Sequence, residues 1–271
     1  MVVQHNMQAV NTNRMLGQNV KAVAKSTEKL SSGYAVNRAG DDAAGLSISE
    51  KMRNQIRGLN QAVKNSEDGI SLIQTAEGNM NEIHSILQRM GELAIKARND
   101  VNATEDRQTI QDEITQLKEE ICSITTKAEF NGTKLLNGNM SSGKLLQVGA
   151  NQGETMKITI SGTSLKKLDL VSVAVTDGAK ASVAIGKIQA AIKNVSAQRS
   201  LLGAVQNRLE YTINNLENYS ENLTSAESQI RDTDMASEMV NFSKNQILQQ
   251  AAQSMLAQAN QSNQGVLSLL Q

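Results

Sequence analysis

Glycines cluster in residues 30–49, LSSGYAVNRAGDDAAGLSIS, a stretch that interrupts an otherwise helix-favouring sequence. A glycine-rich run before a helix can bind phosphate, because the backbone N–H groups at a helix start attract anions. The spacing of Gly33, Gly40 and Gly45 matches neither the dinucleotide-binding pattern nor the phosphate loop, which needs Gly-Lys followed by Ser or Thr. We therefore interpret the stretch as a structural connector rather than a nucleotide site.

Other residue types that could carry chemistry are not arranged for it. His5 and His84 are the only histidines, and neither has a second ligand at metal-binding spacing. The adjacent acids Glu119 and Glu120 point to different helix faces, which indicates solvated surface rather than an acid–base pair. The serines lack the His and Asp partners and the strained turn of a hydrolase. We predict no catalytic residue, no cofactor and no metal, and hence no enzyme.

The composition favours long helices over a globular pocket. The 271 residues include no proline, no tryptophan, three tyrosines and two phenylalanines. Because proline costs about 3 kcal/mol in a helix interior, its absence leaves long helices uninterrupted. The core must then be built from Leu, Ile, Val, Met and Ala. The single cysteine, Cys122, can form no internal disulfide, and we expect it to pack between helices.

Charge and hydropathy exclude two classes of partner. The 27 basic and 27 acidic residues cancel and are interspersed, so they produce no field that would attract nucleic acid or an anionic membrane. No apolar run approaches the ~20 residues that span a bilayer, and the opening MVVQHNMQAV lacks the basic and apolar segments of a secretory signal. We therefore expect neither nucleic acid nor a membrane as a partner.

Apolar residues in the first half of the chain recur at alternating steps of four and three, a pattern typical of helices packed along a seam. This predicts a helix over about residues 44–99 with a local stammer near Ala76. Residues 99–108 are interpreted as a turn with an acidic helix start, which leads to a second, antiparallel helix. The seam residues are Met52, Ile56, Leu59, Val63, Ile70, Ile73, Met80, Ile83, Leu87, Met90 and Ala94, then Ile110, Ile114, Leu117, Ile121, Ile124 and Ala128.

The periodicity changes after the second helix. FNGTKLLNG, residues 130–138, contains two Asn-Gly turn signals that end it. Beyond this turn, Met156, Ile158 and Ile160 alternate with polar residues, which is the two-residue period of a strand. We therefore predict a β-hairpin at about residues 145–160.

Further along the chain, Val171, Val173 and Val175 alternate in the same way and predict another short extended segment. Helical spacing returns over residues 188–230, which predicts a long helix beside the first two. The polar break RDTDMASE, with Asp and Thr suited to capping, precedes a last helix over residues 235–271.

Both ends of the chain carry an apolar stripe opposite an amide-rich face. An isolated helix of this kind buries too little apolar surface to fold alone, so it needs a partner to cover it. That partner is the other end of the same chain, another copy of the chain, or both. The stripe residues are Val3, Met7, Val10, Leu16, Val20, Val23 and Leu30 at the start, and Met239, Phe242, Ala252, Met255, Ala259, Val266 and Leu270 at the end.

The glycine-rich stretch connects two layers of this arrangement. Asp41 and Asp42 lie where a helix start favours negative charge, and Gly33, Gly40 and Gly45 allow backbone conformations that other residues resist. We predict a mainly α fold: a long antiparallel helical bundle or coiled coil with a small β-hairpin. The expected divisions are an N-terminal helix and connector (1–42), the bundle with its hairpin (43–230) and a C-terminal helix (231–271).

Several motifs in a fixed order resemble bacterial flagellin. They are Asn11, Thr12 and Asn13 in an amphipathic N-terminus, LSSGYAVNRAGDDAAGLSISEKMR, FNGTKLL, RDTDMASEMV and the closing VLSLLQ. The resemblance covers most of residues 1–160 and 188–271. Only about 25 residues, 161–185, separate the hairpin from the returning helix, too few for the outer variable domains of larger flagellins.

The resemblance implies a self-assembling filament subunit for motility. Its two ends would pair as a coiled coil lining an inner tube, and the bundle and hairpin would form an outer tube. It further implies an extracellular protein exported through the flagellar type III apparatus without a cleaved signal. Partners implied in the same way are other copies of the chain, the flagellar cap and hook-junction proteins, and an export chaperone at the C-terminal segment.

A second implication of the resemblance is recognition of the free subunit by the flagellin-sensing Toll-like receptor of vertebrates. The segment QRMGEL, residues 88–93, is similar to the recognised patch. The candidate contacts are Gln88, Arg89, Glu92 and Leu93, with Glu113 opposite on the antiparallel helix. Gly91 stands where related sequences often carry a second basic residue, so one contact is lost there.

Two alternatives to a filament subunit remain at this point. A hook–filament junction protein of the flagellum is related in sequence at both ends but present in few copies, and extended self-assembly distinguishes the two. A signalling helical bundle would also have heptad seams, but it would lack the β-hairpin and would have no reason to contain the FNGTKLL motif.

Overall fold

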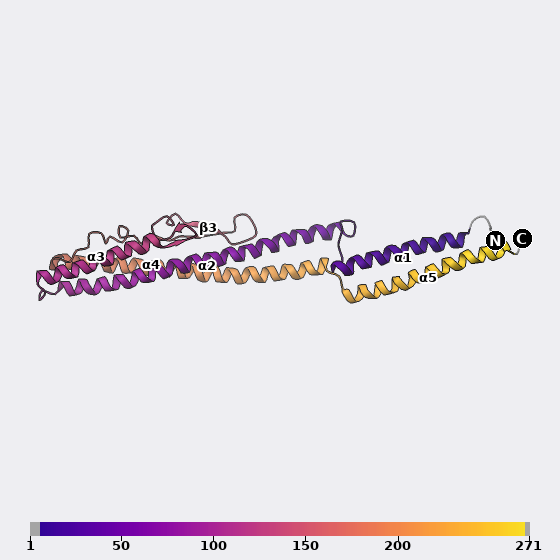
Figure 1. The fold of residues 1–271 in the computed structure, drawn as a ribbon. Coiled ribbons are helices and arrows are strands. Elements are labelled where there is room, and N and C mark those ends of the chain that lie inside the picture. The colour runs from indigo at the N-terminus through magenta and orange to yellow at the C-terminus, as the bar shows by residue number, and fades with distance from the viewer. Residues whose placement is uncertain (1–5, 269–271) are drawn as a thin grey trace. The chain divides into compact units, whose positions relative to one another are not determined.

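The computed structural model describes residues 6–268 and shows a mainly helical fold, as the sequence predicts. Long helices are separated by short connectors, and two pairs of short strands lie in the middle of the chain (Figure 1). In order they are α1 (Met7–Ser32), α2 (Ala43–Arg98), α3 (Thr104–Lys127), β1 (Glu129–Phe130), β2 (Thr133–Lys134), β3 (Lys144–Gln147), β4 (Thr155–Ile158), α4 (Gly178–Arg231) and α5 (Met235–Ser268).

The chain divides into two compact units, whose boundaries fall inside α2 and α4. One unit comprises Met1–Asn54 and Glu221–Gln271, and the other is Gln55–Ser220. The sequence-based division was placed at helix ends instead, after residues 42 and 230. The apolar core of the second unit and the paired terminal helices of the first are therefore separate structures, each with its own packing.

The buried face of α2 follows an unbroken heptad repeat. Its positions alternate by three and four along the helix: Leu59, Ala62, Ser66, Gly69, Ile73, Ala76, Met80, Ile83, Leu87, Met90, Ala94 and Ala97. The stammer predicted near Ala76 is therefore wrong. Small or polar residues such as Ala62, Ser66 and Gly69 occupy seam positions. A pattern based on large apolar side chains therefore does not predict the correct register.

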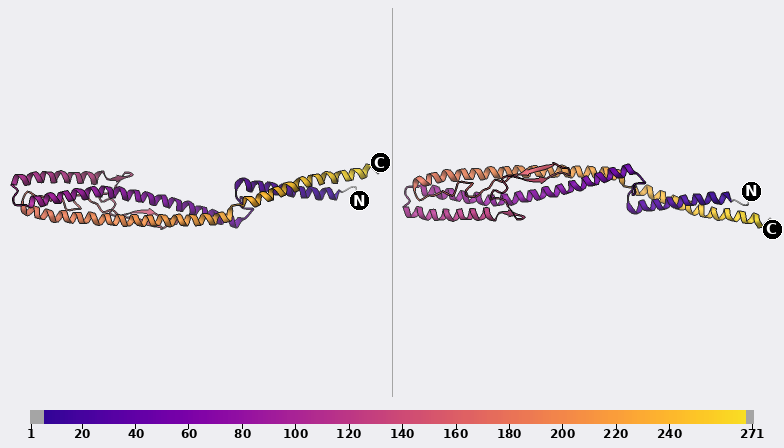
Figure 2. Two further views of the ribbon diagram at one scale, coloured as in Figure 1. Left: turned by 90° about the horizontal axis from the view of Figure 1, so that it is seen from below. Right: turned by 90° about the horizontal axis from the view of Figure 1, so that it is seen from above.

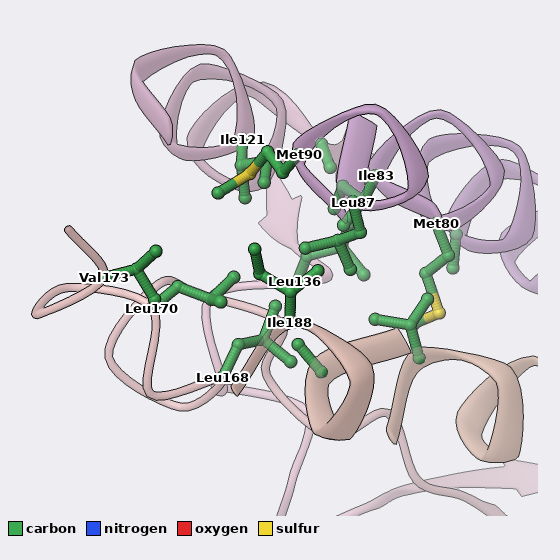
Figure 3. Close-up of a cluster of buried hydrophobic side chains, with 14 of the residues drawn as sticks. Met80, Ile83, Leu87, Met90, Ile121, Leu136, Leu168, Leu170, Val173 and Ile188 are labelled. Carbon is green, nitrogen blue, oxygen red and sulfur yellow. The ribbon is translucent and has the colours of Figure 1, made fainter. Parts of the chain in front are cut away.

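The core of the second unit lies where α2, α3 and α4 meet the irregular segments between them. α3 returns along α2 in the antiparallel sense predicted from the short turn (Figures 1 and 2). Met80 and Leu87 of α2 converge there with Ile121 of α3 and Ile188 of α4, while Leu136 and other residues of the connecting segments close the remaining side (Figure 3).

The predicted β-hairpin is confirmed as the antiparallel pair of β3 and β4. Leu146 pairs with Met156, and Lys144 with Ile158. Met156 and Ile158 are buried against the core. The turn between the strands contains Gly153 at a φ of 91°, a left-handed conformation that glycine adopts at little cost.

The valine-rich segment after the hairpin is an irregular loop, so the prediction of a further extended segment is wrong. Val173 and Val175 are buried while Val171 is exposed. The Nζ of Lys118 donates to the carbonyl oxygens of Val173 (2.5 Å) and Val171 (3.4 Å). Burial lowers the pKa of Lys118. The loop is therefore anchored to α3 through its backbone, for which the side-chain pattern gave no signal.

Two other expectations are corrected. Cys122 is exposed on α3 rather than packed between helices, since Ile121 beside it takes the buried position. α4 begins at Gly178, well before the predicted start at residue 188. Its first turns bury the small residues Ala181 and Ala184, which give a weak hydrophobic signal.

Candidate assembly surface

The two terminal helices, α1 and α5, lie side by side along their length (Figures 1 and 2). Asn6 caps α1, because its Oδ1 accepts from the Ala9 amide at 3.0 Å, while its Nδ2 donates to the Ala259 carbonyl oxygen of α5 at 2.9 Å. α1 ends at Gly33, whose φ of 78° places it in the left-handed region. Asp234 caps α5 by accepting from the amides of the first turn.

The face where α1 and α5 meet is only half apolar. Both helices carry a heptad series of partly or fully buried positions: Ala9, Thr12, Leu16, Asn19, Val23, Ser26 and Leu30 on α1, and Glu238, Phe242, Asn245, Gln249, Ala252, Leu256 and Ala259 on α5. Ala22, Glu28 and Lys29 of α1 are also partly buried and lie outside this series. Leu16, Val23 and Leu30 on α1 share one repeat position, whereas the intervening position carries Thr12, Asn19 and Ser26. A seam of this composition provides little hydrophobic stabilisation.

The apolar residues predicted at the two ends divide into two sets. Leu16, Val23, Leu30, Phe242, Ala252 and Ala259 lie in the seam. Met7, Val10, Val20, Met239 and Met255 are instead exposed, by 69%, 62%, 44%, 51% and 62%. Val3 and Leu270 lie outside the described residues, and the side chain of Val266 does too.

Sequence reasoning missed five further exposed residues of the same kind. They are Met15, Met235, Val240, Ile247 and Leu248, of which Val240 and Ile247 are 68% and 65% exposed. They can be recognised in the sequence as apolar residues that fall between the heptad positions. We call the ten exposed residues of α1 and α5 the assembly surface. Within one chain, α1 and α5 cover only the faces that form their seam. The ten residues of the assembly surface remain exposed to solvent.

The glycine-rich stretch has the local structure of a connector. Asp42 Oδ1 accepts from the amides of Ala44 and Gly45, both at 3.0 Å, so the N–H groups at the start of α2 that a phosphate would need are already bonded. A Cβ on Gly45 would lie 2.4 Å from Asp42 Oδ2. Gly40 has open space around it, so no contact requires glycine there.

Asp41 has a different role from Asp42. Its Oδ1 forms an ion pair with Lys25 Nζ at 2.8 Å, and its Oδ2 accepts from the amides of Arg38 (3.2 Å) and Asn37 (3.4 Å). The hydrogen bond from Lys25, supported by those amides, lowers the pKa of Asp41. The same pairing raises the pKa of Lys25. Asp41 thus ties the connector back to α1.

The two connectors of the first unit are joined to each other. Tyr34 and Asp232 form an antiparallel bridge, in which the Ala35 amide donates to the Arg231 carbonyl oxygen at 2.7 Å. The Arg231 guanidinium lies 4.5 Å from the centre of the Tyr34 ring and 3.1 Å from Glu50. These contacts fix the ends of α1 and α5 next to one another.

Most receptor-contact candidates gather on one face of the second unit. Arg89 lies 2.9 Å from Glu113 and 3.2 Å from Glu92, and Gln88 is exposed beside them. Leu93 is a correction: it is only 3% exposed and packs into the core, because it continues the inward face of α2 next to Ala94. We call Gln88, Arg89, Glu92 and Glu113 the charged face.

Comparison with known proteins places the fold and its sequence in one family. The family model for the bacterial flagellin N-terminal helical region matches residues 3–141, and that for the C-terminal helical region matches residues 185–270. A flagellin of Halalkalibacterium halodurans is 53% identical over 272 residues, which cover all of both chains. The chain belongs to the bacterial flagellins.

A second flagellin is similar over the full length of both chains, and two solved structures match part of this chain. A flagellin of Bacillus subtilis is 49% identical over 307 residues, covering all of both chains. The crystal structure of Bacillus cereus flagellin matches with a TM-score of 0.52 at 31% identity, covering 56% of this chain and 88% of that one. A putative flagellar hook-associated protein from Vibrio parahaemolyticus, at 14% identity and a TM-score of 0.60, shares the fold over 71% of this chain.

Flagellins are the structural proteins of the flagellar filament, which is extracellular, and this chain is a filament subunit of the short form. The residues between the two matched regions form the hairpin, the anchored loop and the start of α4 rather than an outer variable domain. Within residues 6–268, none of the helices is long and apolar enough to cross a membrane.

Proposed function

We propose that this flagellin polymerises by burying the assembly surface of α1 and α5 against the same helices of neighbouring copies. The supporting observation is the size and exposure of its side chains: ten large apolar residues on two helices, each at least 44% exposed. Exposed apolar surface beyond single scattered residues is typical of an interaction site. Burying a side chain of this size contributes about 1.5–3 kcal/mol, and part of the total offsets the freedom lost on association.

The composition of the seam between α1 and α5 supports the same proposal. With Thr12, Asn19 and Ser26 at one repeat position of α1, the helix pair gains little from its own contact. Association with other copies adds the apolar burial that the pair lacks. Folding of the ends and polymerisation are then coupled, and the subunit adds to a filament as its helices order.

Electron microscopy of the purified full chain, seeded with filament fragments, tests this proposal against a chain lacking residues 235–271. We expect long filaments from the full chain alone, because the truncation removes α5 and with it six of the ten residues of the assembly surface. Filaments from the truncated chain would contradict the mechanism. Short stubs from the full chain would instead favour a hook–filament junction protein.

We also propose that the charged face of the free subunit is recognised by the flagellin-sensing Toll-like receptor. The support is that Arg89, Glu92 and Glu113 form one exposed, connected group, to which Gln88 is adjacent. Cells reporting receptor activation would be treated with monomers of the original chain, Arg89→Ala and the control Arg53→Ala. We expect a loss of at least tenfold in potency for Arg89→Ala only. Equal potency of all three would refute this contribution.

Further partners are proposed for the assembly surface. We propose that an export chaperone binds the C-terminal segment before polymerisation, and that the flagellar cap and hook-junction proteins contact the terminal helices at the two ends of the filament. The exposed residues Val240 and Ile247 on α5 provide the apolar contact. Co-purification from secreting cells, with and without Ile247→Asn, tests the chaperone contact, which we expect the substitution to weaken.

A further inference from the structure

A pocket of about 290 Å³ lies between α4 and the segment that follows the β-hairpin. Its lining includes Ser161, Thr163 and Lys167 from that segment and Asn194 and Gln198 from α4. All of these residues belong to the second compact unit. The assembly surface and the charged face do not include any of them.

The hydroxyl of Thr163 is a buried polar group without a partner. Thr163 is 3% exposed, and its Oγ1 has no hydrogen bond to any residue that the structure describes. A buried hydroxyl without a hydrogen bond costs about 1–3 kcal/mol. A hydrogen-bond partner from outside the chain would remove this cost.

The backbone around Thr163 is held in place. Its amide donates to the Leu136 carbonyl oxygen at 2.9 Å. The preceding residue, Gly162, packs so closely on Gly138 that a Cβ would lie 2.9 Å from the Cα and N atoms there. On the opposite wall, Gln198 Nε2 donates to the Thr159 carbonyl oxygen at 3.3 Å. These contacts hold the two walls of the pocket in place.

Three more donor side chains line the pocket. Ser161, Lys167 and Asn194 form no side-chain hydrogen bond or ion pair with any residue in the described part of the chain. Lys166 and Lys193 are next in sequence to Lys167 and Asn194, and they are also without an ion pair to the described residues. No Asp or Glu is among the lining residues. Asp169, next to the lining residue Leu168, is paired with Lys187 at 3.0 Å. The lining itself thus has one cation and no anion, and each of its unpaired polar side chains can donate a hydrogen bond.

From these observations we infer that the pocket binds a carboxylate. A carboxylate has two oxygens with about four acceptor positions, which match one ammonium, two hydroxyls and one amide. A phosphate dianion is usually bound by an arginine fork or a helix N-terminus, and the pocket faces the middle of α4 with a single lining cation. A volume at the lower limit of ligand pockets fits a small acid or one acidic side chain.

The carboxylate has two possible sources. A free small acid would bind the monomer, whereas an Asp or Glu of a neighbouring copy would enter the pocket only in the filament. The second source rests on the proposed polymerisation and the first does not. The two can therefore be tested separately.

The monomer test compares thermal unfolding in sodium acetate with that in sodium chloride at equal ionic strength. The chains are the original, Thr163→Val, Lys167→Gln and the control Lys144→Gln, which changes an exposed hairpin lysine. If a free acid binds, acetate raises the unfolding temperature of the original and control chains by about 2–4 °C more than chloride does, and Thr163→Val and Lys167→Gln abolish the difference.

The filament test measures the temperature at which filaments of the same four chains dissociate. If a neighbouring copy supplies the carboxylate, Thr163→Val and Lys167→Gln lower that temperature while Lys144→Gln does not. Either positive result supports the site and identifies its source. An absence of both effects overturns the inference, and failure of the original chain to form filaments counts against polymerisation while the monomer result still stands.

Discussion

A Cβ atom on Gly58 would lie 2.9 Å from the Cβ of Ala150 and 3.3 Å from its Cα. Gly58 belongs to the middle of a long helix, where glycine costs about 1 kcal/mol relative to alanine. Ala150 belongs to the turn of the hairpin. The loss of helix propensity at Gly58 is therefore offset by the close approach of the hairpin to α2.

This contact predicts opposite effects for the same substitution at two positions of α2. Gly58→Ala forces the turn backbone to move, and we expect a net loss of about 1 kcal/mol in the free energy of unfolding. Gly78→Ala meets nothing within 4 Å and should add up to about 1 kcal/mol. Denaturant unfolding of both variants measures the difference. Equal effects at the two positions would show that the hairpin does not need this approach.

Gly69 provides a graded third case. A Cβ there would meet Leu146 Cδ2 at 2.6 Å, but that atom is the end of a flexible side chain. We expect Gly69→Ala to change the free energy of unfolding by less than Gly58→Ala does, because Leu146 can move without shifting the backbone. The same unfolding experiment ranks the three variants by their free energy of unfolding. If Gly69→Ala were less stable than Gly58→Ala, the argument would be wrong.

The join between the connectors depends on the side chain of Arg231. It contacts the Tyr34 ring and Glu50, and only 12% of it is exposed. We expect Arg231→Gln to cost about 1–2 kcal/mol locally. Hydrogen exchange at the Ala35 and Thr233 amides, which donate across the join, should accelerate about tenfold. Arg53→Gln removes a more exposed partner of the same Glu50 and should leave both amides unchanged.

The ion pair of Lys25 and Asp41 predicts a dependence of the connector on pH. The folded pKa of Asp41 lies below its ordinary value of 3.8, so its contribution is complete above about pH 4 and is lost as the pH falls through the lower folded value. The folded pKa of Lys25 lies above its ordinary value of 10.5, so its contribution is complete below about pH 10 and is lost as the pH rises through the higher folded value.

Amide exchange at Asn37 and Arg38 reports on the acid side of this behaviour, because both amides donate to Asp41. We expect faster exchange below pH 4 than the intrinsic rate predicts, and no such increase in Asp41→Asn. Added salt should weaken the effect, since both side chains are partly in solvent. A profile of Asp41→Asn that matches the original chain would exclude this role for Asp41.

The proposed assembly predicts that exposed apolar residues of α5 affect polymerisation and leave the monomer unchanged. Ile247→Asn alters a side chain that is 65% exposed, so its effect on monomer stability should stay within about 0.5 kcal/mol. We expect the concentration needed for filament growth to rise at least tenfold. Gln250→Asn on the same helix is the matched control. Similar growth of both variants would place the contact elsewhere.

The sequence predicts elements whose signal is carried by large apolar side chains in a regular order. This holds for the lengths of α2, α3 and α5 and for the β-hairpin, and it gives the correct fold class. It fails where contacts are made by small residues or by the backbone. Ser66 and Gly69 hide the register of α2, Ala181 and Ala184 hide the start of α4, and the loop bonded by Lys118 looks like a strand.

The candidate sites divide in the same way. The sequence predicts an apolar stripe at each end of the chain. It does not predict which residues of each stripe pair within the chain. Leu16 lies in the seam and Val20 lies outside it, although both are apolar residues of one helix. The pocket around Thr163 left no sequence signal, because its residues come together through the folding of the segment after the hairpin onto α4.

The polar positions in the seam between α1 and α5 have a consequence for the accuracy of pairing. A shift of one helix along the other would place Asn19 and Asn245 opposite apolar seam residues such as Leu16 and Phe242, where an amide loses hydration. A uniformly apolar seam would tolerate such errors, since any offset buries similar area. Polar residues at seam positions thus favour one register of the α1–α5 pair, at some cost in stability.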